Sequence, residues 1–578
     1  MQAFLGRSLE VAGSRASSGA SIRLAGRGHQ SHDPHLRHQV PSGASPSAAL
    51  GHQKWQGSMG RVPGKPRTSL QGKIQAGLKS EASKPTQLTK DALGTFLSWA
   101  LQNGVSGVGS KESKVALFEG QDVDSRGLVA VKDVKAGEIL LRVPARLAIT
   151  DADKDGPPPP YPGAPWSLTL ASRLLSLREG AAGSAWEPYL EVLPRNAPSP
   201  WLDVTWEALQ IVQYPPARAE LDRLGWIVHE GIAAARAQGA SWSTADFHWA
   251  LGLVHSRTFG SAGKRGGVGV RMLVPLVDMI NHAGDETPES WSPGAEPVSR
   301  DNARWDMVPQ LGGRWTVAVS ATQDIAAGSE LLLSYGERSN DDFLLHYGFV
   351  PPMNPHDDVV LFEDVTEALQ WCAAEFQAPD PALDEAAAVL VWEEAAAAAA
   401  EVAGPVDPGI LLRMPAVEAG AAAREAGRLR LQAQASVDAR FLAVVETLHA
   451  RGWRPCPPDQ GVASLEAALQ VALARRCREL AGAFDSGLCQ DLERLAAVQA
   501  AEGGEHPWAA ALRHYRALEA RAGARWGGKP TADPGVGARD TQPEDTSWST
   551  ERTGLLVLQY QAYKKMILWD GLYCDVTA

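Results

Sequence analysis

The 578-residue sequence has no run of 18 or more apolar residues and little cysteine. Its most alanine-rich stretch, 386–400, is broken by Glu393 and Glu394, which favours a helix of a folded domain over a membrane span. No two cysteines form a Cys-x-x-Cys pair, and no histidine lies nearby at ligand spacing, in the set Cys372, Cys456, Cys477, Cys489 and Cys574. We therefore expect neither a metal site nor a disulfide framework, and a reducing compartment.

Acidic residues are almost absent from the first 80 positions. This segment holds eleven Lys and Arg but only Glu10 and Asp33, although the whole chain has a net charge of −12. The overall balance argues against a nucleic-acid-binding surface. Residues 1–80 are also rich in serine and lack sustained apolar periodicity, so they are typical of an organelle transit peptide, with a disordered basic tail as the alternative.

From about residue 90 the pattern predicts an α+β fold with a β-rich domain over 90–355. A helical insertion over about 166–256 divides this domain, on the basis of repeated apolar spacing of three and four residues. The expected elements are a helix over 91–101, strands over 115–118, 127–131, 139–143, 272–277, 315–319 and 330–334, and insertion helices including 168–177, 206–211 and 247–254.

Beyond residue 360 the composition shifts to Ala, Leu, Glu and Arg, which predicts a second, all-helical domain over 360–570. The spacing predicts long helices over Leu429–Ala450 and Leu465–Ala481, and a last helix over Thr553–Leu568. The Gly- and Pro-rich segment 527–546 is expected to be a flexible loop.

Four short polar segments follow strand-like runs or turns, where a rigid scaffold commonly presents functional groups. They are Asp124–Ala130, Ser256–Phe259, Asp278–His282 and Tyr335–Phe349.

In the third segment, Asp278, Asn281 and His282 directly follow the apolar run MLVPLV. This placement suits a polar cofactor with an adenine edge and an amino-acid end, although a single Asn-His pair is also common at an ordinary strand exit. Tyr335 and Tyr347 could orient an amine and exclude water, whereas either tyrosine alone is typical of a core aromatic.

Together, the wording SRTF, LVPLVDMINH and YGERSNDDFLLHYGF resembles the SET-domain protein methyltransferases, in the branch typified by the Rubisco large-subunit lysine methyltransferase. The resemblance covers about residues 90–570 and is thin beyond 360. It implies S-adenosyl-L-methionine as methyl donor, no metal, and a helical substrate-binding domain after the SET domain.

The resemblance also implies roles for individual residues. Asp124, Ser125 and Arg126 match a cofactor-binding turn, although Ser125 stands where the family often has a glycine. Arg257 matches the contact to the cofactor's carboxylate, Asn281 and His282 bind its amino-acid and adenine ends, and Phe349 packs on it. The catalytic group then comprises Tyr335, Tyr347 and the pocket-lining acid Asp278.

We accordingly expect a protein-lysine N-methyltransferase acting on a non-histone protein, without a nucleic-acid or membrane partner. The residues after His282 are Ala283 and Gly284, not the cysteine usual in histone-directed enzymes. Two alternatives are an actin-type histidine methyltransferase, whose branch lacks a tyrosine at position 347, and a non-catalytic SET-like scaffold. A chloroplast address would make Rubisco or fructose-bisphosphate aldolase the expected substrate class, with mitochondrion and cytoplasm as the other locations.

Overall fold

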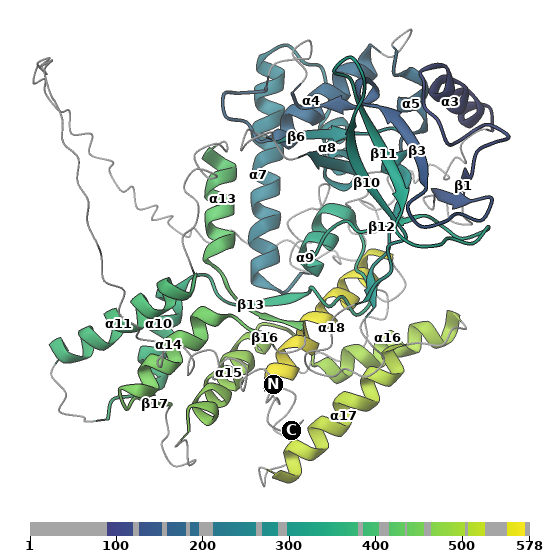
Figure 1. The fold of residues 1–578 in the computed structure, drawn as a ribbon. Helices are drawn as coiled ribbons and strands as arrows, with labels where there is room; N and C mark the ends of the chain where they lie inside the picture. The colour runs from purple at the N-terminus through teal and green to yellow at the C-terminus, as the bar shows by residue number, and fades with distance from the viewer. Residues whose placement is uncertain are drawn as a thin grey trace, which may run out of the picture. The chain divides into compact units, whose positions relative to one another are not determined.

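The computed structural model describes residues 90–119, 126–152, 159–180, 185–195, 212–261, 269–286, 298–379, 385–403, 416–433, 436–455, 464–502, 507–525 and 552–572. Short strands and helices share these ranges, which confirms the α+β class (Figure 1). The transit-peptide interpretation of 1–80 and the loop over 527–546 lie outside them. Within the described ranges, no helix has both the length and the hydropathy that a membrane crossing requires.

The first part of the chain forms several small sheets around one apolar core. Strands β1 (Val115–Glu119) and β2 (Arg126–Ala130) pair antiparallel. One three-stranded sheet has the order β10-β11-β3, from β3 (Ile139–Pro144), β10 (Ala303–Pro309) and β11 (Trp315–Ala321), and another has the order β4-β6-β5, from β4 (Ile149–Thr150), β5 (Thr258–Ser261) and β6 (Val270–Leu273). Two short pairs are β7 (Asn281–His282) with β12 (Leu332–Leu333) and β8 (Asp285–Glu286) with β9 (Val298–Ser299).

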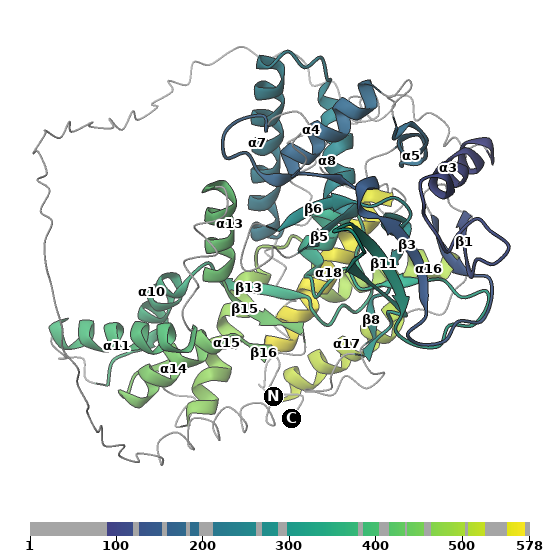
Figure 2. The same ribbon diagram turned by 45° about the horizontal axis from the view of Figure 1, so that its top comes forward.

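Helices cover these sheets, and three of them lie side by side in both ribbon views (Figures 1 and 2). These are α4 (Trp166–Glu179), α7 (Pro215–Ala237) and α8 (Thr244–Arg257); the others are α3 (Lys90–Gln102) and α5 (Glu187–Val192). Helix α8 begins at a capping box in which the Ser243 and Asp246 side chains each accept the other's backbone N–H. The helices predicted over 91–101, 168–177 and 247–254 are confirmed, and 206–211 lies outside the described residues.

The second part is mostly helical but not all-helical, which corrects the prediction for 360–570. Strands β13 (Asp358–Phe362), β15 (Leu429–Gln432) and β16 (Ser436–Val437) form a sheet, and β14 (Phe376–Gln377) pairs with β17 (Arg454–Pro455). The long helix expected over Leu429–Ala450 is therefore wrong in its first part. Leu429 and Leu431 are buried while their neighbours are not, a period of two that belongs to a strand.

The remaining elements of this part are helices: α10 (Val365–Glu375), α11 (Glu385–Ala403), α13 (Ala416–Gly427), α14 (Ala439–Ala450), α15 (Leu465–Ala481), α16 (Leu488–Glu502), α17 (Pro507–Arg525) and α18 (Arg552–Leu572). Helix α18 packs against α15, α16 and β13. The apolar core of this second part also contains Leu344 and Leu345, as well as Tyr214 just before α7. The segment that carries Tyr347 is thus anchored in the second core.

Candidate functional site

The predicted strand 272–277 is shorter than expected, and its early end creates the site. Strand β6 stops at Leu273, because Pro275 has no N–H to donate and the buried Leu276 has a φ of +70°. A left-handed conformation at a non-glycine residue stores about 1–3 kcal/mol and is frequent at functional sites. The chain then enters a 3₁₀ turn, Val277–Met279, that presents Asp278.

Parallel pairing brings the two main polar segments together. Asn281 and His282 lie opposite Leu332 and Leu333 of β12, which is shorter than the predicted strand 330–334. Tyr335 follows two residues after this strand, so its side chain reaches the end of β7. The aromatic rings of His282 and Tyr335 stack with centroids 5.0 Å apart.

The Tyr335 hydroxyl donates a hydrogen bond to the Ile280 carbonyl at 2.8 Å. Its own proton is therefore committed, and the oxygen retains lone pairs that can accept. Burial raises the pKa of Tyr335, so the side chain stays a neutral hydroxyl near pH 7.

His282 is held as a neutral ring. The backbone N–H of Tyr335 donates to His282 Nδ1 at 3.2 Å, whereas the Leu333 carbonyl lies farther from this nitrogen, at 3.4 Å. The shorter contact assigns Nδ1 as the acceptor and the ring proton to Nε2. Burial lowers the pKa of His282, which also favours the neutral form.

Tyr347 closes one side of the site with an aromatic wall. It ends a π-helical turn, Phe343–Tyr347, and Gly348 follows with a φ of +74°. Such turns are uncommon and often occur at functional sites. The ring of Tyr347 stacks on Tyr335 at 5.2 Å, and Phe349 lies 6.2 Å from both Tyr347 and His282.

Asp278 is a buried acid, only 5% exposed, with one satisfied oxygen. The Tyr189 hydroxyl donates to its Oδ2 at 2.8 Å, whereas its Oδ1 accepts no hydrogen bond from the described residues. Burial raises the pKa of Asp278 to about 6, against the opposing effect of Arg257. Asp278 is therefore mostly ionised at pH 7, at a cost in desolvation.

Arg257, the last residue of α8, donates from Nη1 to the backbone carbonyl of Asp278 at 2.6 Å. Its Nε is buried and finds no acceptor among the described residues. A buried guanidinium nitrogen without an acceptor is costly, which marks this place as one that an anionic group would satisfy.

Asn281 links three parts of the site. Its Nδ2 donates to the Arg126 carbonyl at 2.9 Å and to Glu330 Oε1 at 2.7 Å. The Arg126 side chain donates to the Val192 carbonyl. Asp124 and Ser125, the other two residues predicted for this turn, lie outside the described residues.

The structure thus brings eight predicted residues into one neighbourhood: Arg126, Arg257, Asp278, Asn281, His282, Tyr335, Tyr347 and Phe349. Sequence reasoning missed Tyr189, because nothing in its surroundings EPYL indicates that α5 faces a carboxylate 89 residues away. It also missed Glu330, which reads as an ordinary strand-edge residue.

The wall of the site is aromatic, its imidazole is neutral, and its charged side chains include the buried acid Asp278 and the guanidinium of Arg257. Among the described residues, no three His, Cys, Asp or Glu side chains gather closely enough to hold a metal ion.

The sequence profile of the SET domain family matches residues 125–336. This region of the chain is therefore similar to SET domains. The matched region contains Arg126, Arg257, Asn281 and Tyr335, whereas Tyr347 and Phe349 lie beyond its end.

Several relatives match about half of this chain. The actin-histidine N-methyltransferase of Homo sapiens is 27% identical over 289 residues, and that of Gallus gallus is 27% identical over 287 residues. The human match covers 47% of this chain and 44% of the relative, so the chain spans less than half the length of the relatives it matches.

Solved structures of LSMT also align. The SET domain of LSMT bound to lysine and AdoHcy has 16% sequence identity and a TM-score of 0.44, over 84% of this chain and 92% of that one. Rubisco LSMT bound to AdoMet has 17% identity and a TM-score of 0.42.

Proposed function

We propose that this protein is an S-adenosylmethionine-dependent N-methyltransferase that modifies a lysine of another protein. The observation that carries the proposal is the stacked pair Tyr335 and Tyr347, placed beside a buried acid and a guanidinium with an unsatisfied nitrogen. The named relatives support methyl transfer as the reaction class.

The residues present fit the methyl donor. The unsatisfied Nε of Arg257 is suited to the donor's carboxylate, because a guanidinium binds planar anions through several parallel N–H groups. The rings of His282 and Phe349 offer an aromatic surface for the adenine. When bound, S-adenosylmethionine supplies an electrophilic methyl group carried by a sulfonium.

The protein's part in the reaction is to deprotonate and aim the amine. A free lysine has a pKa of about 10.4, and aromatic surroundings next to a positive charge lower it by desolvation and by like-charge repulsion, so the ammonium releases its first proton to solvent. The neutral nitrogen then bonds to the methyl carbon as the carbon–sulfur bond breaks, with its electron pair passing to sulfur. The methylated ammonium afterwards releases one proton to solvent.

Lysine is favoured over histidine by the two hydroxyls. A neutral amine keeps two N–H bonds that need acceptors while its lone pair points at the methyl group, and Tyr335 has acceptor lone pairs because its proton goes to Ile280. Tyr347 supplies a second hydroxyl on the ring stacked against it. An imidazole has one nitrogen to orient and needs fewer such partners.

Histidine is the second candidate, because the relatives that match at 27% identity act on a histidine of actin by name. We further propose a plastid protein as the lysine substrate, from the transit-peptide composition of residues 1–80. The helical part of the chain is proposed to hold the protein substrate.

The test is labelling followed by hydrolysis to amino acids. The full chain is incubated with tritiated S-adenosylmethionine and, in parallel, with plastid stroma, mitochondrial matrix or purified actin, and the products are resolved into methyllysines and methylhistidine. We expect methyllysine from stroma. Methylhistidine from actin would show that the acceptor is histidine, the second candidate. If no product is labelled and calorimetry detects no binding of S-adenosylhomocysteine, the protein is a non-catalytic scaffold.

A further inference from the structure

Lys564, on helix α18, is completely buried. Its Nζ lies 2.7 Å from Asp357 Oδ1 and 3.1 Å from Asp341 Oδ1, and it donates to the Asp358 carbonyl at 2.6 Å. A buried ammonium is tolerated only when its partners are well placed, because desolvating it is expensive. The position of Lys564 is therefore tightly coupled to these three acceptors.

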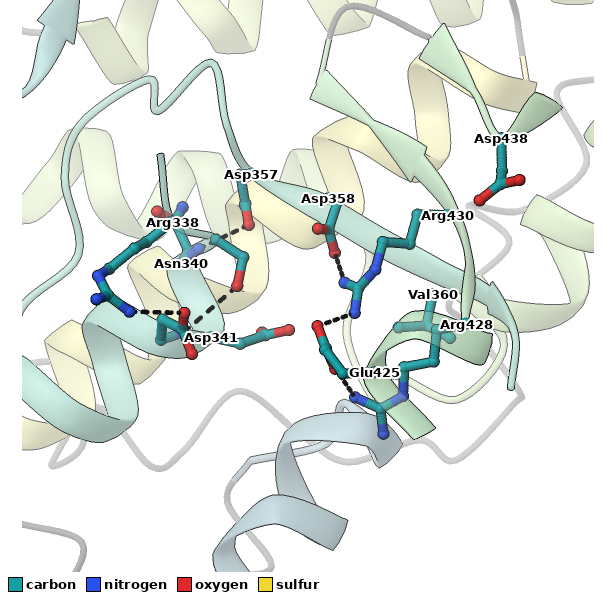
Figure 3. A network of polar contacts seen from close by, with 12 residues as sticks. Arg338, Asn340, Asp341, Asp357, Asp358, Val360, Glu425, Arg428, Arg430 and Asp438 are labelled. Carbon is teal, nitrogen blue, oxygen red and sulfur yellow. Dashed lines mark hydrogen bonds and ion pairs between the residues drawn. The ribbon is translucent and has the colours of Figure 1, made fainter. Parts of the chain in front are cut away.

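Of these acceptors, Asp341 lies in the segment that leads into Tyr347, and Asp357 is hydrogen-bonded to that segment. Asp357 Oδ1 also accepts the backbone N–H of Asn340 at 2.9 Å, as Figure 3 shows. Asn340 and Asp341 begin the short helix α9 (Asn340–Asp342), which continues directly into the π-helical turn. Lys564 thus holds the start of the turn that ends at Tyr347.

The same segment also supports Tyr335. Asn354 donates to the Arg338 carbonyl at 2.8 Å and to Asn340 Oδ1 at 3.0 Å. Arg338 in turn donates from Nε to the Tyr335 carbonyl at 2.9 Å, and its guanidinium lies 5.6 Å from the centre of the Tyr347 ring. A displacement at Asn340 would therefore move both tyrosines.

The ion pairs around Lys564 leave its charge to neutralise Asp341 and Asp357. Arg430 pairs with Asp358 at 2.7 Å and also with Glu425, as Figure 3 shows, so the third carboxylate has its own cation. Burial lowers the pKa of Lys564, but the two carboxylates outweigh it and the ammonium keeps its charge.

Aromatic side chains enclose the ammonium. The rings of Tyr214 and Tyr560 lie 5.3 and 5.5 Å from Nζ, and the Tyr560 hydroxyl donates to Asp341. Tyr560 is one helical turn before Lys564, so α18 contacts Asp341 through two side chains.

We propose that Lys564 is a positioning residue through which the C-terminal helix α18 fixes the site segment 335–349. Its relevance to catalysis rests on the proposed methyl transfer. Its role in holding residues 335–349 in place does not depend on that activity, since it concerns only the structure of this segment.

The chain offers a matched control in the next residue. Lys565 is also buried, at 2% exposure, but it pairs with Asp491 of α16 and with Ser486 Oγ at 3.0 Å. Lys564→Met and Lys565→Met therefore each remove one buried charge from the same helix. Lys564 pairs with Asp341 of the site segment, whereas the ion pair of Lys565 is with Asp491 of α16.

The two variants are compared by hydrogen exchange over peptides spanning 335–349. They are also compared by methyl transfer into the acceptor that the labelling experiment identifies. We expect Lys564→Met to speed exchange in this segment at least about tenfold and to lower kcat roughly 10- to 100-fold. S-adenosylhomocysteine affinity should change less than about threefold because, of the proposed donor contacts Arg257, His282 and Phe349, only Phe349 lies in this segment. Lys565→Met should leave both the exchange of 335–349 and kcat unchanged.

Equal effects of the two variants would overturn the proposal, because they would reflect general loss of stability. If the wild-type chain transfers no methyl group, the proposed function fails and the exchange measurement alone decides the role of Lys564. If Lys564→Met does not fold, Tyr560→Phe removes only the hydrogen bond to Asp341 and should speed exchange in the same peptides; unchanged exchange there would also refute the proposal.

Discussion

Tyr335 and Tyr347 stack with ring centroids 5.2 Å apart and planes inclined by 26°. Twelve residues separate them, and they belong to unlike elements, a strand end and a π-helical turn. Gly336, with a φ of +101°, lets the chain turn away directly after Tyr335. The stack therefore depends on the tertiary structure around both residues. The contributions of the two hydroxyls can be distinguished by mutating each tyrosine in turn.

Tyr335→Phe should lower kcat by about 100-fold or more, a typical loss when one preorganised polar group in a transferase site is removed. S-adenosylhomocysteine affinity should stay nearly constant, because the proposed donor contacts are made by other residues. Radiolabelled transfer and calorimetry measure the two quantities. An unchanged kcat would refute the catalytic role of Tyr335.

Tyr347→Phe keeps the aromatic stack but removes one hydroxyl. It therefore tests whether this hydroxyl selects lysine over histidine as the methyl acceptor. We expect the KM for the lysine substrate to rise and kcat to fall about tenfold, as one orienting hydrogen bond is lost. Amino-acid analysis of the labelled product measures whether lysine is still the acceptor. If the wild type labels histidine and the variant is equally active, Tyr347 has no part in orientation.

Much of the site could be predicted because its residues lie in two dense segments, Asp278–His282 and Tyr335–Phe349. Their resemblance to the SET-domain methyltransferases singled them out before any contact was known. The strand expected over 272–277 ends before Pro275 and Leu276. A missing N–H and a positive φ act at single residues, and a hydrophobic pattern read over several residues does not reveal them.

Long-range partners were harder to predict. Tyr189 reaches Asp278 across 89 residues, and no spacing rule connects them. Lys564 carried a usable signal, since two adjacent lysines within QAYKKMILW interrupt an apolar helix and indicate buried ion pairs. The strand Leu429–Gln432 was missed because a four-residue alternation inside alanine-rich helices is too short to outweigh its surroundings.

Arg257→Lys tests the proposed contact to the donor's carboxylate. Lysine can replace the single bond to the Asp278 carbonyl but not the second, unsatisfied nitrogen, so we expect S-adenosylhomocysteine to bind about tenfold more weakly. Arg178→Lys is the control, because Arg178 pairs with Asp246 and belongs to no proposed donor contact. Calorimetry that shows equal binding by the two variants would contradict the assignment of Arg257.

Asp278 should make stability depend on pH in a specific direction. Its pKa is about 6 in the folded protein, mainly because of burial, against an ordinary value of 3.8. Between these values the folded state holds a proton that the unfolded state has released. The contribution of Asp278 to stability is therefore complete below about pH 4 and is lost as pH rises through 6.

Asp278→Asn removes this titration while its side-chain oxygen can still accept from Tyr189. Relative to the variant, the wild type should lose on the order of 2 kcal/mol of unfolding free energy between pH 4 and pH 7, since each pKa unit corresponds to about 1.4 kcal/mol. Urea denaturation at both pH values measures the difference, and the other buried carboxylates cancel because both proteins contain them. Parallel pH dependence in the two proteins would show that the pKa of Asp278 in the folded protein is not raised above its ordinary value.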